Sequence, residues 1–362
     1  MLLQELLDNK KILPVGRTWL NNDLLFLNFS GSGIRCNVSG NEINITFFAT
    51  KYNEENSCPY ITVFLNNKRS DYALDSEYKT ITIPLNEGIN QLRILKRTES
   101  NVSHAAIKEI SGVEFHDVEV KKRLNIEFYG DSLTCGFGAL STDPNLPFET
   151  KTESFFDAYP YKLSQKLDAN YSAVCVSGFP VYKSRWNQGF PLDSVADMIS
   201  ISSYHNDDTL QTAPKWDNKN YKPDLVIINL GTNDESYLSV GQDWVDELVK
   251  EVGSIEEARK HPKFVNELDL MYKRILKFLD DLYKIYGKDL KVVYIMGMVD
   301  VIGFIYDTIL KAINEFNNPN ATFFKLTGPK PDDVFGSVWH PGSKMHDNTA
   351  EELYNHIKNN IL

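Results

Sequence analysis

The chain has 362 residues, of which 42% are hydrophobic and 24% are charged, a balance typical of a folded protein rather than a disordered one. This length predicts one large domain or two of ordinary size. The formal net charge of −11 disfavours a polyanionic partner such as a nucleic acid. No stretch approaches the roughly 18 uninterrupted apolar residues of a membrane span, so we expect no membrane association.

The start of the chain and its cysteines carry information about the compartment. The first residues contain Glu5 and Asp8 and lack the basic start of a secretory signal, so we expect a cytoplasmic protein unless a signal has been removed. The cysteines are scattered and lack C-x-x-C spacing, which predicts mostly buried thiols without a disulfide framework or a zinc site. They are Cys36, Cys58, Cys135 and Cys175.

From residue 10 to about residue 118, apolar and polar residues alternate with a period of two. Short segments rich in β-branched and aromatic residues, such as LLFLNFSG, EINITFFAT and YITVFLNN, are separated by Asn, Gly or Ser turns. No convincing helical pattern interrupts them. This pattern predicts an antiparallel, jelly-roll-like β-sandwich as a first domain over residues 1–118.

The pattern changes after the segment DVEVKKR at residues 117–123. Four nearly continuous apolar segments, LNIEFYG, YSAVCVSG, DLVIINLG and KVVYIMG, predict strands that are buried on both faces. Segments with helical periodicity lie between and after them, including the long FVNELDLMYKRILKFLDDLYKIYG and the closing TAEELYNHIKNNIL. The alternation predicts a second domain over residues 119–362, a doubly wound parallel sheet with helices on both faces.

Three of these strands end in small-residue motifs, GDS, SGF and GTND, at the edge where such sheets bind ligands. Ser132 in GDS can be a nucleophile exposed at a sharp turn, Gly178 allows close backbone approach, and Asn233 can donate an amide hydrogen bond. Asp234 can accept backbone hydrogen bonds and fix its loop. In isolation each motif is more typical of an ordinary turn than of a functional site. Their convergence favours a functional site.

A base must come from elsewhere, and the chain has seven histidines. His340 lies in GSVWHPGSKMH, between the last predicted strand and the closing helix, and Pro341 stiffens the backbone beside it. We expect His340 to be the base and His346 to pack or cap a helix. The other histidines are expected at polar, exposed positions: His104, His116, His205, His261 and His356.

These residues carry a resemblance to a known family. GDSLTCGFG with Ser132, SG with Gly178, GTND with Asn233 and HP with His340 follow in the order of the four blocks of SGNH, or GDSL, hydrolases. The segments GRTWLNNDLLFLNFSGSGIRCNVSGNEINITF and KWDNKNYKPDLVIINLGTND, together with the domain order, resemble carbohydrate esterase family 2. Its members are acetyl (xylan) esterases that act on plant polysaccharides. The resemblance covers most of the chain.

The resemblance implies a serine esterase that removes O-acetyl groups from acetylated saccharides. Ser132 would be the nucleophile and His340 the base, and an oxyanion hole would combine the backbone N–H groups of Ser132 and Gly178 with the amide of Asn233. No metal or cofactor is implied, because acyl transfer by this device needs none. The expected partner is an acetylated saccharide substrate.

One position departs from the family pattern. Most superfamily members carry an aspartate three residues before the histidine, whereas this chain has Ser337. Some family 2 enzymes lack that acid and hold the histidine with a main-chain carbonyl, which here belongs to Val338. We therefore expect a Ser–His dyad. Asp332 and Asp333 lie close enough in sequence to supply the acid, and this alternative stays open.

Two tryptophans flank the predicted site. Trp339, beside the base, and Trp186, after the Gly178 turn, are candidates for a wall on which a sugar stacks, although for either residue alone core packing is the more usual role of a tryptophan. Two rival functions also stay open: a carbohydrate-binding protein with a vestigial hydrolase domain, and an SGNH esterase of lipids or thioesters. The sequence leaves open the sugar, the hydroxyl, the oligomeric state and the orientation of the sandwich.

Overall fold

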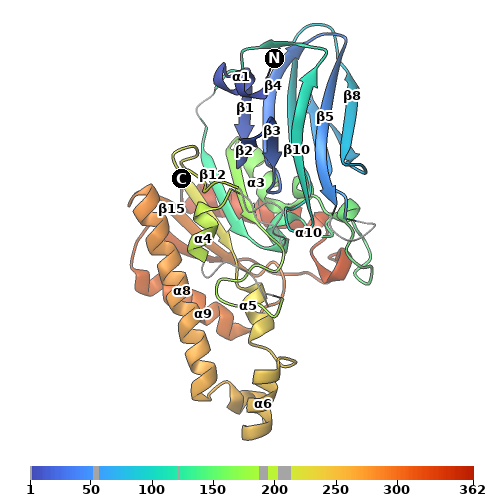
Figure 1. Cartoon of the computed structure of the whole chain (residues 1–362). Coiled ribbons are helices and arrows are strands. Elements are labelled where there is room, and N and C mark those ends of the chain that lie inside the picture. Colours follow the sequence, from blue (N-terminus) through green and yellow to red (C-terminus); the bar gives the residue numbers. More distant parts are fainter. Residues whose placement is uncertain (1, 52–56, 121–122, 187–194, 203–212) are drawn as a thin grey trace.

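The computed structural model of the protein describes residues 2–51, 57–120, 123–186, 195–202 and 213–362. Antiparallel strands form an N-terminal β module, drawn at the top of Figure 1, and a parallel sheet with helices follows below it. The predicted fold class is confirmed. The last strand of the β module ends at His116, and the first parallel strand begins at Asn125.

The β module consists of two sheets in which every pairing is antiparallel. The first sheet contains, in spatial order, β1 (Ile12–Val15), β4 (Gly33–Ser39), β9 (Asn90–Lys96), β6 (Tyr60–Leu65) and β7 (Lys68–Ala73), with β11 (Glu114–His116) paired to β4. The second contains β2 (Thr18–Asn21), β3 (Leu24–Leu27), β10 (Ser103–Ser111), β5 (Glu42–Lys51) and β8 (Tyr78–Pro84). The short helix α1 (Leu3–Asp8) precedes β1.

The period of two in the sequence explains the core of the β module. Along β5, the side chains of Ile43, Ile45 and Phe47 are fully buried, and the residues between them are partly exposed. Successive side chains of a strand point to opposite faces, so one face of each sheet can be apolar. The apolar faces of the two sheets meet in one shared core.

The second module is built on a sheet whose pairings are all parallel. Its strands, in spatial order, are β13 (Asn170–Cys175), β12 (Asn125–Gly130), β14 (Leu225–Asn229), β15 (Lys291–Met296) and β16 (Ala321–Lys325). The edge strand β16 was not among the predicted strands, because only its first residue is buried and it has no continuous apolar run. The order of the strands reverses between β12 and β14, which makes this the topological switch point where ligands bind in such sheets.

Helices cover both faces of the parallel sheet. One face carries α3 (Tyr159–Lys166) and α10 (Ser343–Asn360). The other carries α4 (Val195–Ser200), α8 (Pro262–Tyr286) and α9 (Gly303–Phe316). The other α-helices described in this module are α2 (Ser132–Cys135), α5 (Thr232–Tyr237), α6 (Asp243–Val252) and α7 (Ile255–Ala258). No helix in the described part of the chain is both long and apolar enough to cross a bilayer.

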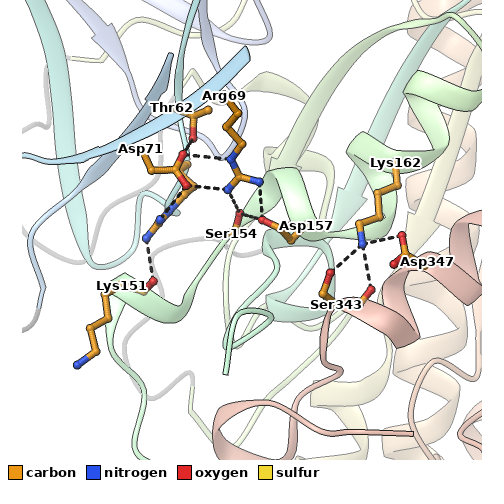
Figure 2. Close-up of polar contacts among 10 residues, drawn as sticks. Thr62, Arg69, Asp71, Lys151, Ser154, Asp157, Lys162, Ser343 and Asp347 are labelled. Carbon is orange, nitrogen blue, oxygen red and sulfur yellow. Dashed lines mark hydrogen bonds and ion pairs between the residues drawn. The ribbon is translucent and has the colours of Figure 1, made fainter. Parts of the chain in front are cut away.

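Charged side chains join the two modules. Arg17 of the β module lies 3.0 Å from Glu127 of β12, and both side chains are fully buried. Figure 2 shows a second junction, where Arg69 on β7 faces the turn at residues 154–157. Nη1 of Arg69 lies 2.7 Å from Oδ2 of Asp157, and Nη2 donates to Oγ of Ser154 over 3.0 Å. These contacts fix the β module against segments that lead into the site described next.

Candidate active site

The turn between β12 and α2 positions Ser132. Oδ1 of Asp131 accepts a hydrogen bond from the backbone N–H of Leu133 (3.0 Å) and so caps the helix that begins at Ser132. A Cβ on Gly130 would lie 2.0 Å from Oγ1 of Thr134, so only glycine fits there. The Ser132 side chain is thereby held at the carboxyl end of β12, and the residue keeps an exposed fraction of 8%.

His340 lies beside Ser132. Its Nε2 is 2.9 Å from Oγ of Ser132, and its Nδ1 is 3.0 Å from the carbonyl oxygen of Val338. A carbonyl only accepts hydrogen bonds, so Nδ1 carries the proton and donates it to Val338. Nε2 then has a free lone pair that accepts the Ser132 hydroxyl. The ring of Phe137 packs on the imidazole with centroids 4.2 Å apart.

Burial controls the charge of this imidazole. Removal from water disfavours the protonated ring and lowers the pKa of His340 from 6.5 to about 4, although the carbonyls of Val338 and Ser337 act in the opposite direction. At neutral pH the ring is therefore neutral and able to accept a proton.

The loop before His340 has an unusual backbone. Val338 and Trp339 have φ values of 53° and 57°, a left-handed conformation that is rare for residues other than glycine. This turn directs the Val338 carbonyl at the imidazole. The loop packs closely on Gly138 of GFG, where a Cβ would lie 2.9 Å from the backbone nitrogen of Ser337. The second glycine of that motif therefore allows the loop carrying the histidine to approach the serine turn.

Asn233 and the Gly178 turn complete the cluster. Nδ2 of Asn233 donates to Oδ2 of Asp131 (2.9 Å) and to the carbonyl of Phe179 (3.1 Å). Asn233 thus links the residue before Ser132 to the residue after Gly178, whose φ is +82°. The structure therefore brings together the turns of Ser132, Gly178 and Asn233, and His340 is hydrogen-bonded to Ser132. Both amide hydrogens of Asn233 already have protein acceptors.

Two buried carboxyl groups support these turns. Asp131 and Asp234 are almost fully buried, and removal from water raises the pKa of each to about 7, while hydrogen bonds from N–H groups act to lower it. Asp234 accepts the backbone N–H groups of Val181 (2.8 Å) and Tyr182 (2.7 Å). It therefore fixes the loop after Gly178, as we expected for a residue that accepts backbone hydrogen bonds.

The acids considered as alternative partners of His340 make other contacts. Oδ2 of Asp332 lies 3.2 Å from the ammonium of Lys344, and Oδ2 of Asp333 accepts the backbone N–H of Lys330 over 2.8 Å. Ser337 is fully buried against Gly138.

The other histidines differ in part from expectation. His346 is fully buried, and its Nδ1 accepts the backbone N–H of Tyr159 (3.2 Å), so it packs as expected. His104, expected to be exposed, is fully buried because both faces of the first half of β10 are covered. His205 lies outside the described residues.

The two tryptophans are exposed. Trp186 and Trp339 have exposed fractions of 67% and 62%, which rules out the alternative that they pack in the core. A Cβ on Gly178 would lie 3.7 Å from the Cβ of Trp186, so this side chain borders the Gly178 turn. Trp339 precedes the histidine. The Arg185 guanidinium lies 5.9 Å from the centroid of the Trp186 ring, and the ring of Phe335 lies 5.8 Å from that of Trp339, so each exposed ring keeps one neighbour.

One feature of the site is not apparent in the sequence. Among the described residues, one group has the geometry to hold a cation: Glu99, Cys135 and Glu153, whose ligand atoms lie within 4.8 Å of one another and are all buried. The side chain of Lys96 is buried beside them and supplies a positive charge. Glu99 comes from the β module and meets Ser177, next to Gly178. Nothing in its local sequence, RTES at residues 97–100, marks Glu99 as a residue of the site.

A serine hydroxyl bonded to the free nitrogen of an imidazole, at the switch point of a doubly wound sheet, defines the kind of site that serine hydrolases use. Comparison with known families agrees with this class. Residues 126–353 match the family described as GDSL-like lipase/acylhydrolase, and residues 14–118 match the family described as carbohydrate esterase 2 N-terminal. The chain belongs to the GDSL-like lipase/acylhydrolase family, and its resemblance to family 2 carbohydrate esterases is confirmed.

Curated relatives carry esterase names. An acetylxylan esterase/glucomannan deacetylase of Cellvibrio japonicus is 28% identical over 232 residues, which are 62% of this chain and 62% of that protein. A cellulase/esterase, CelE, of Acetivibrio thermocellus is 24% identical over 351 residues, which are 92% of this chain and 37% of that protein. The chain thus spans less than two thirds of the length of each of these relatives.

Solved structures share the whole two-module fold. A family two carbohydrate esterase from Clostridium thermocellum in complex with cellohexaose has a TM-score of 0.78 at 20% identity, covering 96% of this chain and 98% of that chain. An acetyl xylan esterase from Butyrivibrio proteoclasticus has a TM-score of 0.80 at 20% identity, covering 98% of this chain and 96% of that chain. At this identity the likeness shows the fold.

Proposed function

We propose that the protein is a serine esterase that removes O-acetyl groups from acetylated plant-polysaccharide sugars or oligosaccharides. The observation that carries the proposal is the chain of contacts from the Val338 carbonyl through His340 to the Ser132 hydroxyl, at 3.0 and 2.9 Å. It fixes the tautomer that accepts a proton from serine without a carboxylate.

The proposed reaction uses the residues in a defined order. The Ser132 oxygen attacks the ester carbonyl while Nε2 of His340 takes the hydroxyl proton. The tetrahedral oxyanion is bound by the backbone N–H groups of Ser132 and Gly178 and by the Asn233 amide. The C–O bond to the sugar then breaks, and His340 returns the proton to the sugar oxygen. Water hydrolyses the acetyl-serine by the same steps and releases acetate.

The amide of Asn233 needs one adjustment in this mechanism. Its Nδ2 already donates hydrogen bonds to Oδ2 of Asp131 and to the Phe179 carbonyl. Donation to an oxyanion therefore requires that one of these hydrogen bonds be shared or released when the tetrahedral intermediate forms. A negatively charged oxygen is a stronger acceptor than the Phe179 carbonyl, so this exchange is favourable in the transition state.

The saccharide substrate is supported by two observations. The curated relatives are named as acetylxylan esterases or glucomannan deacetylases and as a cellulase/esterase. Trp186 borders the Gly178 turn, Trp339 precedes His340, and both are exposed; exposed aromatic faces are suited to stacking on the apolar faces of sugar rings.

The experiment that tests the proposal measures acetate release from acetylated xylan, acetylated glucomannan and short acetylated oligosaccharides. We expect turnover by the wild type and a loss of at least about 10³-fold in Ser132→Ala, because the nucleophile is removed. Equal rates for the two proteins on every substrate would contradict the proposal.

A second candidate is a carbohydrate-binding protein without turnover. It is favoured by the exposed tryptophans and by the family two esterase structure that holds cellohexaose. The same experiment separates the two functions when binding of cellohexaose is measured alongside. Binding without acetate release from any substrate would support the binding protein, whereas acetate release that depends on Ser132 would exclude it.

A further inference from the structure

The side chain of Glu99 connects the β module to the turn that contains Gly178. Glu99 follows strand β9 and is fully buried. The hydroxyl of Ser177 donates to its Oε1 over 2.5 Å, and the backbone N–H of Ser177 donates to its Oε2 over 2.7 Å. Two hydrogen bonds from one residue to both oxygens of a carboxyl group fix the position and orientation of that residue.

The same carboxyl group also contacts the nucleophile segment. Sγ of Cys135, in the helix that begins at Ser132, lies 3.9 Å from Oε2 of Glu99. The Glu99 carboxyl group thus lies between the two segments whose backbone N–H groups, at Ser132 and Gly178, form part of the proposed oxyanion hole.

Glu99 is itself firmly held. Its backbone N–H donates to Oε1 of the buried Glu153 (3.1 Å), and its carbonyl accepts the Lys96 ammonium (2.6 Å). Lys96 also donates to the carbonyls of Asn28 (3.0 Å) and Ser103 (2.8 Å), all within the β module. Glu153 belongs to the segment that Arg97 grips through the carbonyls of Thr150 and Lys151, at 3.1 and 2.9 Å. These hydrogen bonds hold the backbone of Glu99 in place within the β module.

The Gly178 turn needs such support. Gly178 has no side chain to pack, and its φ of +82° is held only by its neighbours. Asn233 holds the turn on one side through the Phe179 carbonyl (3.1 Å). Glu99 holds it on the other side through Ser177. Displacement of an oxyanion donor by about 1 Å is enough to cost on the order of 10² in rate.

We propose that Glu99 is a positioning residue for the oxyanion hole, so that the β module is part of the catalytic machinery. This inference rests on the proposed esterase function and extends it: a residue outside the hydrolase module sets the place of the Gly178 N–H group. The competing explanation is that Glu99 only helps to fasten the two modules together.

The test compares Glu99→Ala, Glu99→Gln and a control, Tyr171→Phe. The control removes one buried hydrogen bond between the modules, from the Tyr171 hydroxyl to the Gly31 carbonyl (3.1 Å), near the beginning of β13 and away from Ser177. Two quantities are measured for each folded protein. They are kcat and KM for an acetate ester, and the rate of amide hydrogen exchange in the peptide that contains Ser177 and Gly178.

We expect Glu99→Ala to lower kcat by roughly 10–100-fold with KM within about threefold, because only the transition state uses the oxyanion hole. Amide exchange at Ser177 and Gly178 should accelerate in the same variant. Glu99→Gln keeps an acceptor for the Ser177 N–H and should stay within about fivefold of wild type. Tyr171→Phe should leave both kcat and the exchange of this peptide unchanged.

If Glu99→Ala does not fold, Ser177→Ala takes its place, since it removes only the hydroxyl hydrogen bond to Oε1. Wild-type kcat and unchanged exchange in Glu99→Ala, or an equal loss in Tyr171→Phe, would overturn the inference. Failure of the esterase proposal looks different. In that case the wild type itself releases no acetate, while faster exchange in Glu99→Ala would still establish that Glu99 positions the turn.

Discussion

The Nδ1 atom of His340 donates to the carbonyl oxygen of Val338, 3.0 Å away, and in the proposed mechanism this contact takes the place that a carboxylate occupies in a catalytic triad. A carbonyl fixes the tautomer of the imidazole but brings no full negative charge. The protonated form of the buried ring therefore lacks the stabilisation that the negative charge of a triad aspartate would supply.

The first prediction concerns pH. Burial lowers the pKa of His340 to about 4, so the neutral ring that can act as a base persists well below pH 6.5. We expect the titration of His340 to leave kcat/KM nearly unchanged down to about pH 5 and to halve it near pH 4. A pH profile of kcat/KM on a chromogenic acetate measures this, and an acid limb at pH 6.5 or above would contradict it.

Stability must be followed in the same pH range. His340 and His346 have folded-state pKa values of about 4 and 3, below the 6.5 of the unfolded chain. At these two histidines the unfolded chain binds more protons, which decreases the free energy of unfolding as pH falls from about 6.5 towards 4. Asp131 and Asp234 act in the opposite direction, because their folded-state pKa of about 7 lies above the 3.8 of the unfolded chain and the folded chain binds more protons there. Rates are accordingly compared only where the circular dichroism signal remains native.

The second prediction tests the strained loop. Val338 has φ 53° and ψ 40°, its side chain is half exposed, and its contribution to His340 is a main-chain carbonyl. Val338→Gly should leave kcat within about threefold of the wild-type value, because glycine keeps the main-chain carbonyl. The free energy of unfolding should stay within about 1 kcal/mol of wild type, because relief of roughly 1 kcal/mol of strain offsets the entropy that glycine adds to the unfolded chain.

Val338→Pro is the matched opposite change. Proline cannot adopt a positive φ, and it lacks the N–H that Val338 donates to the Leu146 carbonyl (3.2 Å). We expect a loss of about 10² in kcat or more, because the carbonyl no longer faces the imidazole. Equal activities for the glycine and proline variants would show that this turn does not orient the base.

The third prediction concerns the nearby acids. Asp332 is paired with Lys344 and Asp333 with the Lys330 backbone. Replacement of either by Ala should leave kcat within roughly tenfold of wild type. A loss of about 10⁴, the size seen when a triad aspartate is neutralised, would identify that residue as the acid and reject the dyad.

The sequence predicted the elements whose apolar residues form a clear pattern. Strands β12, β13, β14 and β15 were found because their residues are buried on both faces and form continuous apolar runs. The edge strand β16 escaped because solvent meets most of it. Helix α10 begins at Ser343, earlier than the predicted segment. The prediction missed this start because SKMHDN shows no apolar period; in the structure it is marked by the close contact of Gly342 with Val334.

The placement of the site residues was predictable where local motifs end strands, and for His340 from the HP motif before the closing helix. The serine, glycine and asparagine turns follow from the rule that parallel strands end at one edge. Glu99 was not predictable, because it meets Ser177 across 78 residues and two modules. His104 was placed wrongly for a related reason: its polar sequence context does not reveal that Ala106, two residues further along β10, packs with Trp19, Phe26 and Ala213 of the second module.

The fourth prediction concerns Asn233. In the proposed mechanism its amide binds the oxyanion after sharing or releasing one of its present hydrogen bonds, so Asn233→Ala should lower kcat by on the order of 10²–10³ while KM changes by less than about threefold. The change also leaves Oδ2 of the buried Asp131 without its partner, which should cost about 1–3 kcal/mol of stability. Steady-state kinetics well below the melting temperature of the variant separate the two effects. Wild-type kcat in Asn233→Ala would show that this amide does not bind the oxyanion.

The fifth prediction concerns Trp186 and Trp339. Both rings are more than half exposed, so replacement by Ala should change the free energy of unfolding by less than about 0.5 kcal/mol. If the rings stack on sugars, each loss should raise KM for acetylated oligosaccharides by roughly 3–15-fold, the equivalent of about 0.5–1.5 kcal/mol of ring contact.

Small substrates provide the contrast for these tryptophans. A chromogenic acetate does not extend to a stacking wall, so its kcat and KM should stay within about twofold in both variants. Leu310→Ala, which removes an exposed apolar side chain on α9, is the matched control and should affect neither substrate. A rise in KM for oligosaccharides alone would identify the two rings as the saccharide-binding wall. Unchanged KM values in the Trp186→Ala/Trp339→Ala double variant would mean that these two rings do not contribute to the affinity for the sugar.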